Sequence, residues 1–405
     1  MSYTFVKIAD YYPEAIKSYY KKHSNIRNKS YNEQLNHLMG QAIGWADFFT
    51  KNMKKFGINA YEIVANAIPL QKAWAKEHGI KAIGHELIVE QLKTLQPDVV
   101  FFQNSFNCSG DWINYIRSEL SKVKKIIGWC CIGYSPKDFE RLRPFDYLLT
   151  CTPGFKHKLN QEGKLTYQLN HAFEESLLAK LINNHYSETN LIFIGSLFQT
   201  KGFHNFRLNV IEDLIKQNIQ IRIHSKLEES LYWKTFIKQL LWYMVNDSTN
   251  IIPKKYLMKF PLVNRILQWQ EKPVLRRYPH QIKLSTYPPL FGLEMLRAIA
   301  KAKIGFNIHL DSAGQYAGNM RLFEVTGVGT CLLTDHKKNI SRLFVPDKEI
   351  LTYSSVEECI EKAKWLLEHP KERKIIAQAG QARVLKEHTF YHRAKELDSI
   401  IRKNL

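Results

Sequence analysis

The residues best suited to chemistry lie in one stretch of the chain, Lys303 to Asp335. It opens with an apolar run, Ile304 to Ile308, which is too short for a core helix and β-branched at both ends, so it predicts a buried strand. A loop of small polar residues follows, Asp311 to Gly318, and then a pattern typical of a two-turn helix, Met320 to Thr326. A second buried strand is predicted over Thr330 to Thr334. A strand, a small-residue loop and a helix N-terminus in this order offer free backbone N–H groups to a phosphate.

The predicted helix also carries side chains that suit a nucleotide. Asn319 has the side chain of an N-cap, and Gly327 is suited to end the helix. Glu324 lies five residues after Asn319, which is about 7.5 Å along a helix axis at about 1.5 Å per residue. With a diphosphate at the helix start, this carboxylate would accept both ribose hydroxyls, and Arg321 would pair with phosphate oxygens. The alternative is an ordinary α/β unit in which Glu324 is simply solvated.

A family resemblance supports the nucleotide interpretation. The run NMRLFEVTGVGTCLLTD, Asn319 to Asp335, resembles the C-terminal signature of the CgeB/YkvP-like glycosyltransferases, which are related to glycosyltransferase family 4. The resemblance continues over Leu343 to Arg393 and returns at SYNEQLNHLMGQAIGWADFF and EIVANAIPLQKAWAKEHG. It implies an α/β protein with the GT-B fold: two Rossmann-like domains facing across a cleft, with the C-terminal helix crossing back to the N-domain. It also implies a nucleotide-dependent glycosyltransferase of the hexosyltransferase type, with its donor bound mainly by the C-terminal domain.

The second domain carries part of the family's diphosphate motif. The pattern G-R-L-x-x-x-K-G is matched at Gly195, Leu197, Lys201 and Gly202. Ser196 replaces the arginine of the motif, so Lys201 is left as the catalytic cation that meets charge developing on the leaving diphosphate. Arg207 or Arg321 would supply the missing positive charge. The alternative is that Lys201 and Arg207 are exposed charges on a loop and a helix.

The sugar-binding part of the family pattern is incomplete. In the family's E-x7-E motif, Glu324 matches the second glutamate, but the first position holds Tyr316. Asn307 and His309 alternate to the same face at the end of a predicted strand, and we expect them to contact the donor, although a satisfied core histidine is the commoner outcome. The predicted donor-binding residues are Gly195, Ser196, Arg207, Asn307, His309, Gly318, Asn319, Met320 and Glu324.

A catalytic base is harder to assign. The position at which many family 4 enzymes carry a histidine holds Cys130, Cys131 and Ile132 here, so His171 is the fallback candidate. Family 4 resemblance implies retention of configuration, in which the leaving phosphate accepts the proton of the acceptor. No D-x-D motif occurs, so we expect no metal and no cofactor beyond the nucleotide sugar. His388 and His392 have an i,i+4 spacing that suits zinc, but surface or capping roles are favoured without a third ligand.

Composition sets wider limits on the protein. At 405 residues the chain is long enough for two domains, and 45% hydrophobic residues exclude a disordered chain. No apolar run reaches the length of about 18 residues that spans a bilayer. The N-terminus lacks a signal-peptide pattern, so we expect a cytoplasmic protein. Six cysteines without a CxxC pair predict reduced and mostly buried thiols.

Strands alternating with helices predict parallel sheets. In the N-terminal half, strands are predicted over Tyr3 to Ala9, Ile58 to Val64, 98–103, Lys125 to Ile132 and Asp146 to Cys151, and one long helix over Ser30 to Phe56. The predicted domains are an N-terminal acceptor domain over 1–173, a linker over 174–190, a donor domain over 191–388 and a helix over 389–405 that returns to the N-domain.

An unusual insertion is predicted over 225–284. It interleaves large aromatic and basic residues, among them Trp233, Trp242, Tyr243, Lys254, Lys255, Tyr256, Lys259, Phe260, Arg265, Trp269, Arg276, Arg277 and Tyr278. This composition suits an anionic membrane surface on the inner face of the membrane. The alternatives are an insertion that packs its aromatics onto its own domain and, less favoured, a nucleic-acid grip.

The sequence therefore predicts a donor-binding site but leaves the acceptor open. A cell-surface polysaccharide or lipopolysaccharide-type glycan, which would include a lipid-linked one, is the favoured acceptor, and a protein is the second choice. A sugar-nucleotide epimerase and a non-catalytic basic binding protein stay open as rivals. The formal charge of +20 attracts any polyanion and does not decide between these classes.

Overall fold

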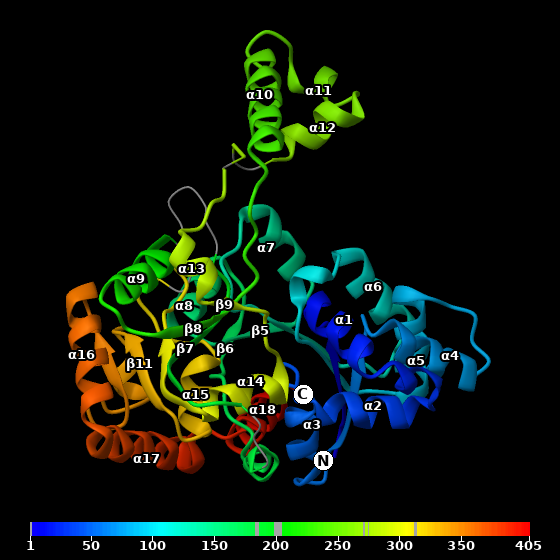
Figure 1. Cartoon of the computed structure of the whole chain (residues 1–405). Helices are drawn as coiled ribbons and strands as arrows, with labels where there is room; N and C mark the ends of the chain where they lie inside the picture. The colour runs from blue at the N-terminus through cyan, green and yellow to red at the C-terminus, as the bar shows by residue number, and fades with distance from the viewer. Residues whose placement is uncertain (1, 183–185, 198–204, 270–271, 274, 312–313) are drawn as a thin grey trace. The chain divides into compact units, whose positions relative to one another are not determined.

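The computed structural model describes residues 2–182, 186–197, 205–269, 272–273, 275–311 and 314–405 (Figure 1). These residues form two six-stranded sheets whose strands are connected mainly by helices. Every strand pair with an assigned register is parallel. The α/β class predicted from the sequence is confirmed.

The first sheet has the strand order β2-β1-β3-β4-β5-β6. Its strands are β1 (Thr4–Ala9), β2 (Asn59–Val64), β3 (Val99–Phe102), β4 (Lys125–Trp129), β5 (Tyr147–Thr150) and β6 (Thr166–Gln168). Phe5 of β1 lies opposite Ala60 on one side and Val99 on the other. All four residues of β3 are buried, as expected for parallel strands that have helices on both faces. The five strands predicted in this half are confirmed.

Helices of the N-terminal half connect these strands. They are α1 (Pro13–Lys22), α2 (Tyr31–Gly40), α3 (Phe48–Lys54), α4 (Ile68–Glu77), α5 (Gly84–Leu95), α6 (Gly110–Glu119), α7 (Pro136–Leu142) and α8 (Pro153–Gln161), with 3-10 turns η1 (Ser24–Asn28) and η2 (Ser105–Asn107). The prediction of one long helix over Ser30 to Phe56 is wrong. Ala42, Gly44 and Ala46 have φ values of 56°, 60° and 38°, and this left-handed backbone cannot continue a right-handed helix.

A buried lysine anchors the loop between α2 and α3. Lys7 Nζ donates to the carbonyl of Ala46 at 2.7 Å and to Gln103 Oε1 at 3.2 Å. It also lies 3.3 Å from Glu62 Oε1, and its side chain is 0% exposed. Glu62 in turn accepts a hydrogen bond from Thr50 of α3 at 2.9 Å. One ion pair therefore connects two neighbouring strands to the broken helical segment.

The second sheet has the strand order β12-β11-β10-β7-β8-β9. Its strands are β7 (Thr189–Ile194), β8 (Ile221–His224), β9 (Thr286–Tyr287), β10 (Ala302–Asn307), β11 (Cys331–Asp335) and β12 (Leu351–Tyr353). Its helices include α9 (Asn205–Lys216), α14 (Gly292–Ala300), α15 (Arg321–Gly327), α16 (Val356–Glu368) and α17 (Pro370–Glu387), with 3-10 turns η3 (Glu175–Leu181) and η5 (Ile340–Arg342). The strand–loop–helix–strand unit predicted between 304 and 334 is thus confirmed, with shifts of one or two residues.

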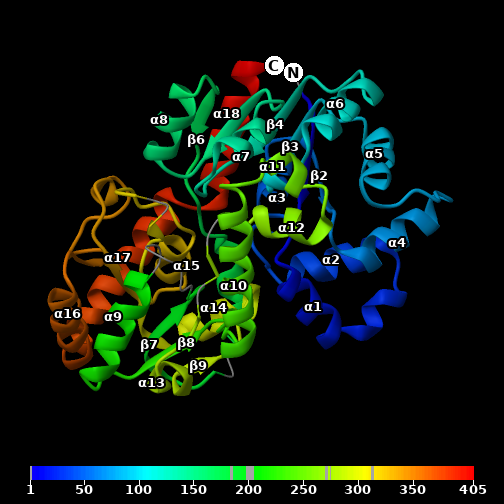
Figure 2. The ribbon, with the colours of Figure 1, turned by 90° about the horizontal axis from the view of Figure 1, so that it is seen from above.

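The last helix, α18 (Phe390–Asn404), returns to the N-terminal sheet and lies beside α3 (Figures 1 and 2). The Phe390 ring contacts the rings of Phe48 and Phe49 at centroid distances of 5.0 and 5.2 Å. At the far end of the helix, Tyr3 donates its hydroxyl to Asp398 at 2.8 Å. The predicted crossing of the C-terminal helix back to the N-domain is confirmed.

The chain divides into two compact units, one formed by Met1–Ile192 with Leu290–Leu405 and the other by Phe193–Pro289. We call them unit 1 and unit 2. Unit 2 contains four further helices, α10 (Tyr232–Ser248), α11 (Lys254–Leu257), α12 (Pro261–Leu267) and α13 (His280–Leu284). These units are defined by compactness, whereas the predicted domains over 1–173 and 191–388 follow the expected acceptor and donor roles, so the domain boundaries stay a prediction.

Replacing Lys7 with methionine should destabilise the first sheet, because it leaves the Glu62 carboxylate buried without a cation and the Ala46 carbonyl without its donor. Breaking such a pair typically costs about 3 kcal/mol or more, so the apparent melting temperature should fall by roughly 5 °C or more. Adding Glu62→Gln to the variant should recover part of the loss. Equal melting temperatures for the single variant and the native protein would contradict this role.

Candidate active site

Polar side chains meet where β10 and β11 end side by side. In the parallel register Asn307, the last residue of β10, lies opposite Thr334 of β11. Asn307 donates its amide to Thr334 Oγ1 at 2.9 Å, and the Thr334 hydroxyl lies 3.3 Å from Asp335 Oδ1. The carboxyl ends of parallel strands are the usual place for a ligand in an α/β protein.

Asp335 fixes the histidine that follows β10. Its Oδ1 accepts from the backbone N–H of His309 at 2.9 Å and lies 2.7 Å from His309 Nδ1. Lys337 Nζ lies 3.2 Å from the other carboxylate oxygen. Burial by itself would raise the pKa of Asp335, but His309 and Lys337 outweigh it and lower the pKa to about 2. The ionised Asp335 therefore accepts a hydrogen bond from His309 Nδ1, and Nε2 is the ring nitrogen left for another partner.

The same network continues to the loop before α15. Asn319 donates its side-chain amide to Asn307 Oδ1 at 2.7 Å. The prediction that Asn319 caps the helix is wrong, because α15 begins at Arg321 and the cap residue is Met320, which makes no side-chain cap bond. Asn319 Oδ1 and His309 Nε2 are buried atoms without a hydrogen-bond partner among the described residues. We call His309, Asp335, Thr334, Asn307 and Asn319 the strand-end network.

The first turn of α15 holds an ion pair rather than free charges. Arg321 Nη1 lies 2.5 Å from Glu324 Oε2 and 2.9 Å from Met295 Sδ, while Arg321 Nε is buried without a partner in the part of the chain that is described. Glu324 is only 8% exposed, so it is not the solvated acid of the alternative interpretation. Burial raises the pKa of Glu324, and the attraction of Arg321 offsets part of that rise.

The loop before α15 also packs against the first sheet, within unit 1. A Cβ on Gly318 would lie 2.4 Å from Thr152 Cγ2 and 2.9 Å from the carbonyl of Cys151. A Cβ on Gly154 would lie 2.6 Å from the ring of Tyr316, the residue that replaces the family's first glutamate. Glycine is needed at both positions, and the strand-end network therefore lies close to the end of β5.

His171 lies in the N-terminal part of unit 1. Trp45 Nε1 donates to His171 Nδ1 at 3.3 Å, and the rings of Trp45 and Trp129 lie 5.5 and 5.3 Å from it. Burial, with a further contribution from Arg393, lowers the pKa of His171 to about 3. The imidazole is therefore neutral at pH 7, with one nitrogen occupied by the indole.

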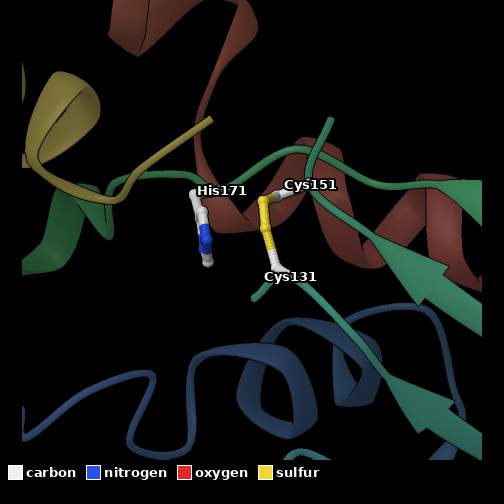
Figure 3. A group of neighbouring side chains, drawn as sticks. All are labelled: Cys131, Cys151 and His171. Atoms are coloured by element: carbon white, nitrogen blue, oxygen red, sulfur yellow. A yellow bond between two sulfur atoms is a disulfide. The ribbon is translucent and has the colours of Figure 1, made fainter. Parts of the chain in front are cut away.

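Two cysteines next to His171 form a disulfide, Cys131–Cys151 (Figure 3). Each follows a strand of the first sheet, β4 or β5, and the His171 ring lies beside the bonded sulfur atoms. The expectation of reduced thiols is wrong for this pair, because the parallel strand ends bring them to a Cα separation of 5.6 Å, which suits a disulfide. Cys108, Cys130, Cys331 and Cys359 are free and buried, as predicted.

The disulfide and His171 also contain the ligand types for a metal ion. The atoms of Cys131, Cys151 and His171 lie within 4.8 Å of one another, and no other such group occurs in the described ranges. The sulfur atoms are bonded to each other, so only the dithiol form would offer two thiolates. His388 and His392, whose spacing suits zinc, have structural roles instead. His392 completes a capping box with Thr389, and Nδ1 of buried His388 accepts a hydrogen bond from Arg393 at 2.7 Å.

The residues that match the diphosphate pattern in the sequence, Gly195 to Gly202, belong to unit 2. Arg207 Nη1 donates to the carbonyl of Ser196 at 3.2 Å, and the backbone N–H of Gly195 donates to the backbone carbonyl of His224 at 3.2 Å. Arg207 is 8% exposed, so it is not a solvated helix charge. Lys201 and Gly202 lie outside the described residues. The contacts made by Ser196 and Arg207 maintain the turn after β7.

Sequence reasoning missed Asp335 and Thr334 as site residues. A signal was present, because Thr334 ends the second predicted strand and Asp335 follows it directly. Neighbouring parallel strands bring their carboxyl ends to one edge, and this rule would have placed them beside His309. The contribution of Trp45 had no comparable signal, since it depends on a helix break that the pattern did not reveal.

The two parallel sheets and the returning helix are those of the GT-B fold, which solved glycosyltransferases share. Residues 247–399 match a protein family described as glycosyl transferase-like. This range contains β10, α15, β11 and the whole strand-end network. The C-terminal part of the chain is therefore glycosyltransferase-like in sequence, and the described chain has the fold of glycosyltransferases.

Three solved structures illustrate the likeness in fold. A glycosyltransferase from Rickettsia africae has 11% identity and a TM-score of 0.52, covering 100% of this chain and 98% of its own. Anabaena HepE in complex with UDP and glucose has 10% identity and a TM-score of 0.53, covering 99% and 100%. Sucrose-phosphate synthase from Thermosynechococcus elongatus has 11% identity and a TM-score of 0.51, covering 99% and 98%. No curated protein matches this chain in sequence.

Replacing Asp335 with asparagine should make stability less dependent on pH in acid. The folded pKa of about 2 lies below the ordinary value of 3.8, so the carboxylate stabilises the protein fully above about pH 5 and loses roughly half of that effect by pH 3. The difference in urea midpoint between native protein and variant should therefore shrink between these pH values. Asp347→Asn, whose side chain is 62% exposed, is the matched control. An Asp335→Asn difference that is the same at both pH values would contradict the assignment.

The Cys131–Cys151 disulfide predicts a thiol count. In denaturant without reductant, four of the six cysteines should react with a thiol reagent, and all six should react after reduction. The variant Cys131→Ser should show five reactive thiols under both conditions, because Cys151 loses its partner. Six reactive thiols in the unreduced native protein would rule the disulfide out.

Proposed function

We propose that this protein is a glycosyltransferase that moves a sugar from a nucleotide donor to a hydroxyl group. The observation that carries the proposal is the strand-end network with its unpaired buried atoms. Asn319 Oδ1 is an acceptor, His309 Nε2 is a ring nitrogen, and outside the network Arg321 Nε is a donor. Unsatisfied buried polar atoms are costly, so a ligand that completes their hydrogen bonds is favoured where several of them follow neighbouring strands. Sugar hydroxyls, which both donate and accept, complement the first two atoms, and a phosphate oxygen complements the donor.

The donor is a nucleoside diphosphate sugar, with Glu324 as the acceptor for the ribose hydroxyls. Anabaena HepE, which shares the fold, binds UDP and glucose, and this supports a UDP sugar as the first donor to test. Lys201 is the cation assigned to the diphosphate, with Arg207 or Arg321 as the second, because the diphosphate gains negative charge as the sugar–phosphate bond breaks. We assign the protein to the CgeB/YkvP-like group on the sequence pattern around Glu324.

The reaction proposed is metal-independent and retaining. In this scheme, the sugar–phosphate bond breaks as the acceptor hydroxyl attacks, and the leaving phosphate takes the proton of that hydroxyl. His171 is poorly suited to a cationic role, because its pKa of about 3 keeps it neutral. We assign it to positioning through Trp45 rather than to proton transfer. The favoured acceptor is a cell-surface polysaccharide or lipopolysaccharide-type glycan, with a protein as the alternative.

Glu324→Gln should weaken UDP binding by about 10-fold or more, because it removes a charge-assisted hydrogen bond worth roughly 1.5–3 kcal/mol. Calorimetric titration with UDP measures the affinity, and a melting curve shows whether loss of the Arg321 pair unfolds α15. Glu361→Gln, an exposed acid on α16, is the matched control. The proposed function fails if the native protein binds no nucleoside diphosphate, or if the Glu324 variant folds normally and binds UDP as the native protein does.

A further inference from the structure

We propose that the segment from α10 to α12, residues 231–269, inserts apolar side chains into the headgroup region of an anionic membrane. The proposal goes beyond the proposed function, which assigns no membrane contact to the protein. It concerns a part of unit 2 that contains no residue of the strand-end network. Figure 1 shows β8 connected to α10 by a segment without helix or strand, residues 225–231.

The first observation is an apolar stripe that α10 exposes instead of burying. Trp233, Phe236, Leu240 and Met244 follow one another at helical spacing and are 57%, 56%, 50% and 57% exposed. Only Thr235 and Val245 of its 17 residues are buried. A helix of a globular protein normally turns such a stripe toward the core, and a large exposed apolar patch marks an interaction surface.

The turn and the short helices that follow extend this surface. Ile251 and Ile252, between α10 and α11, are 86% and 42% exposed. Met258, Phe260 and Leu262 are 51%, 63% and 65% exposed. Trp233, Tyr243, Tyr256 and Phe260 are also exposed, at 57%, 45%, 49% and 63%, so the alternative of aromatics packed onto their own domain does not account for them, although it holds for buried Tyr278.

The second observation is the charge carried by the same segment. Residues 231–269 contain six lysines and arginines and one acid, Asp247. The six are Lys234, Lys238, Lys254, Lys255, Lys259 and Arg265, and none of them forms an ion pair with a described acid. Three lie over exposed aromatic rings: Lys234 at 5.2 Å from Trp233, and Lys255 and Lys259 at 4.9 and 5.8 Å from Tyr256.

Cations beside exposed aromatic rings fit the depth of lipid headgroups. There the rings settle between acyl chains and water, and the cations meet anionic phosphates. A nucleic acid would use the cations and the aromatic faces, but it offers nothing to the exposed aliphatic side chains of Ile251, Leu240 and Leu262. The combination therefore selects a lipid surface.

The segment lies on a membrane rather than crossing it. No helix among the described residues is long and apolar enough to span a bilayer. At 17 residues, α10 is about 25 Å long, and its lysines at 234 and 238 interrupt the apolar pattern. A helix with an apolar stripe and flanking cations binds in the plane of the interface.

Vesicle co-sedimentation of the full chain tests the proposal. The native protein should bind vesicles of phosphatidylcholine with phosphatidylglycerol far better than vesicles of phosphatidylcholine alone. Lys254→Gln, Lys255→Gln and Lys259→Gln together should weaken binding about 100-fold, at roughly fivefold for each lysine near an anionic surface. Lys371→Gln with Lys374→Gln on α17 is the control and should have little effect.

The apolar contribution has its own variant. Ile251→Glu with Ile252→Glu should weaken binding about 10-fold or more, whereas Ile83→Glu with Ile182→Glu, two isoleucines exposed at 80% and 81% elsewhere, should not. Binding that tolerates glutamates at 251 and 252 and is competed away by single-stranded DNA would overturn the proposal in favour of a nucleic acid. No binding of the native protein to anionic vesicles would also overturn it.

UDP titration of the same variants separates this inference from the proposed function. Native UDP affinity in the lysine and isoleucine variants shows that they are folded, so their loss of vesicle binding then supports membrane insertion. A native protein that binds UDP but no vesicles overturns membrane insertion alone. A protein that binds vesicles through these residues but binds no nucleoside diphosphate overturns the transferase and leaves the membrane segment standing.

Discussion

The ionised carboxylate of Asp335 is the interaction on which the candidate site depends. It binds the backbone and the ring of His309 at once and so fixes the position of the imidazole. An uncompensated buried carboxylate would be costly, and here the His309 contacts and Lys337 compensate it. Hydrogen bonds connect Asp335 through Thr334 and Asn307 to Asn319, so atoms on two strands and one loop are fixed relative to each other. Such preorganisation is what a site for charge redistribution needs.

A second constraint acts in the first sheet and reaches a neighbouring group. The buried ammonium of Lys7 holds the carbonyl of Ala46, and the residue before it is Trp45. Because Trp45 donates to His171, the ion pair that anchors the helix break also contributes to the orientation of this imidazole. The helix break is therefore needed for this contact, because a continuous helix could not place Trp45 where it lies. The contacts of Lys7 thus stabilise the first sheet and also help to position the His171 side chain.

Much of the fold could be predicted from the sequence, because short apolar runs such as 98–103 and 304–308 allow few structures other than buried parallel strands. The site was predictable where a side chain follows such a strand, as His309 does. The helix break that places Trp45 was not predictable, because Ala42 and Ala46 adopt positive φ there and alanine otherwise favours a helix. The Cys131–Cys151 pairing also had no local signal. It arises because β4 and β5 are neighbours, and neighbourhood is a property of the sheet rather than of either segment.

Under the two proposals, the strand-end network and the exposed segment over 231–269 have different tasks: the network selects the donor, and the segment brings the protein to the surface that holds the acceptor. A nucleotide sugar diffuses in water, so buried and preorganised groups are enough to select it. A lipid-linked glycan is confined to a surface, and a protein held at that surface meets it at a raised effective concentration without any further contact. Under the proposed membrane insertion, the cations of the segment would act twice: they would keep unbound molecules apart by mutual repulsion, and they would attract the anionic lipid.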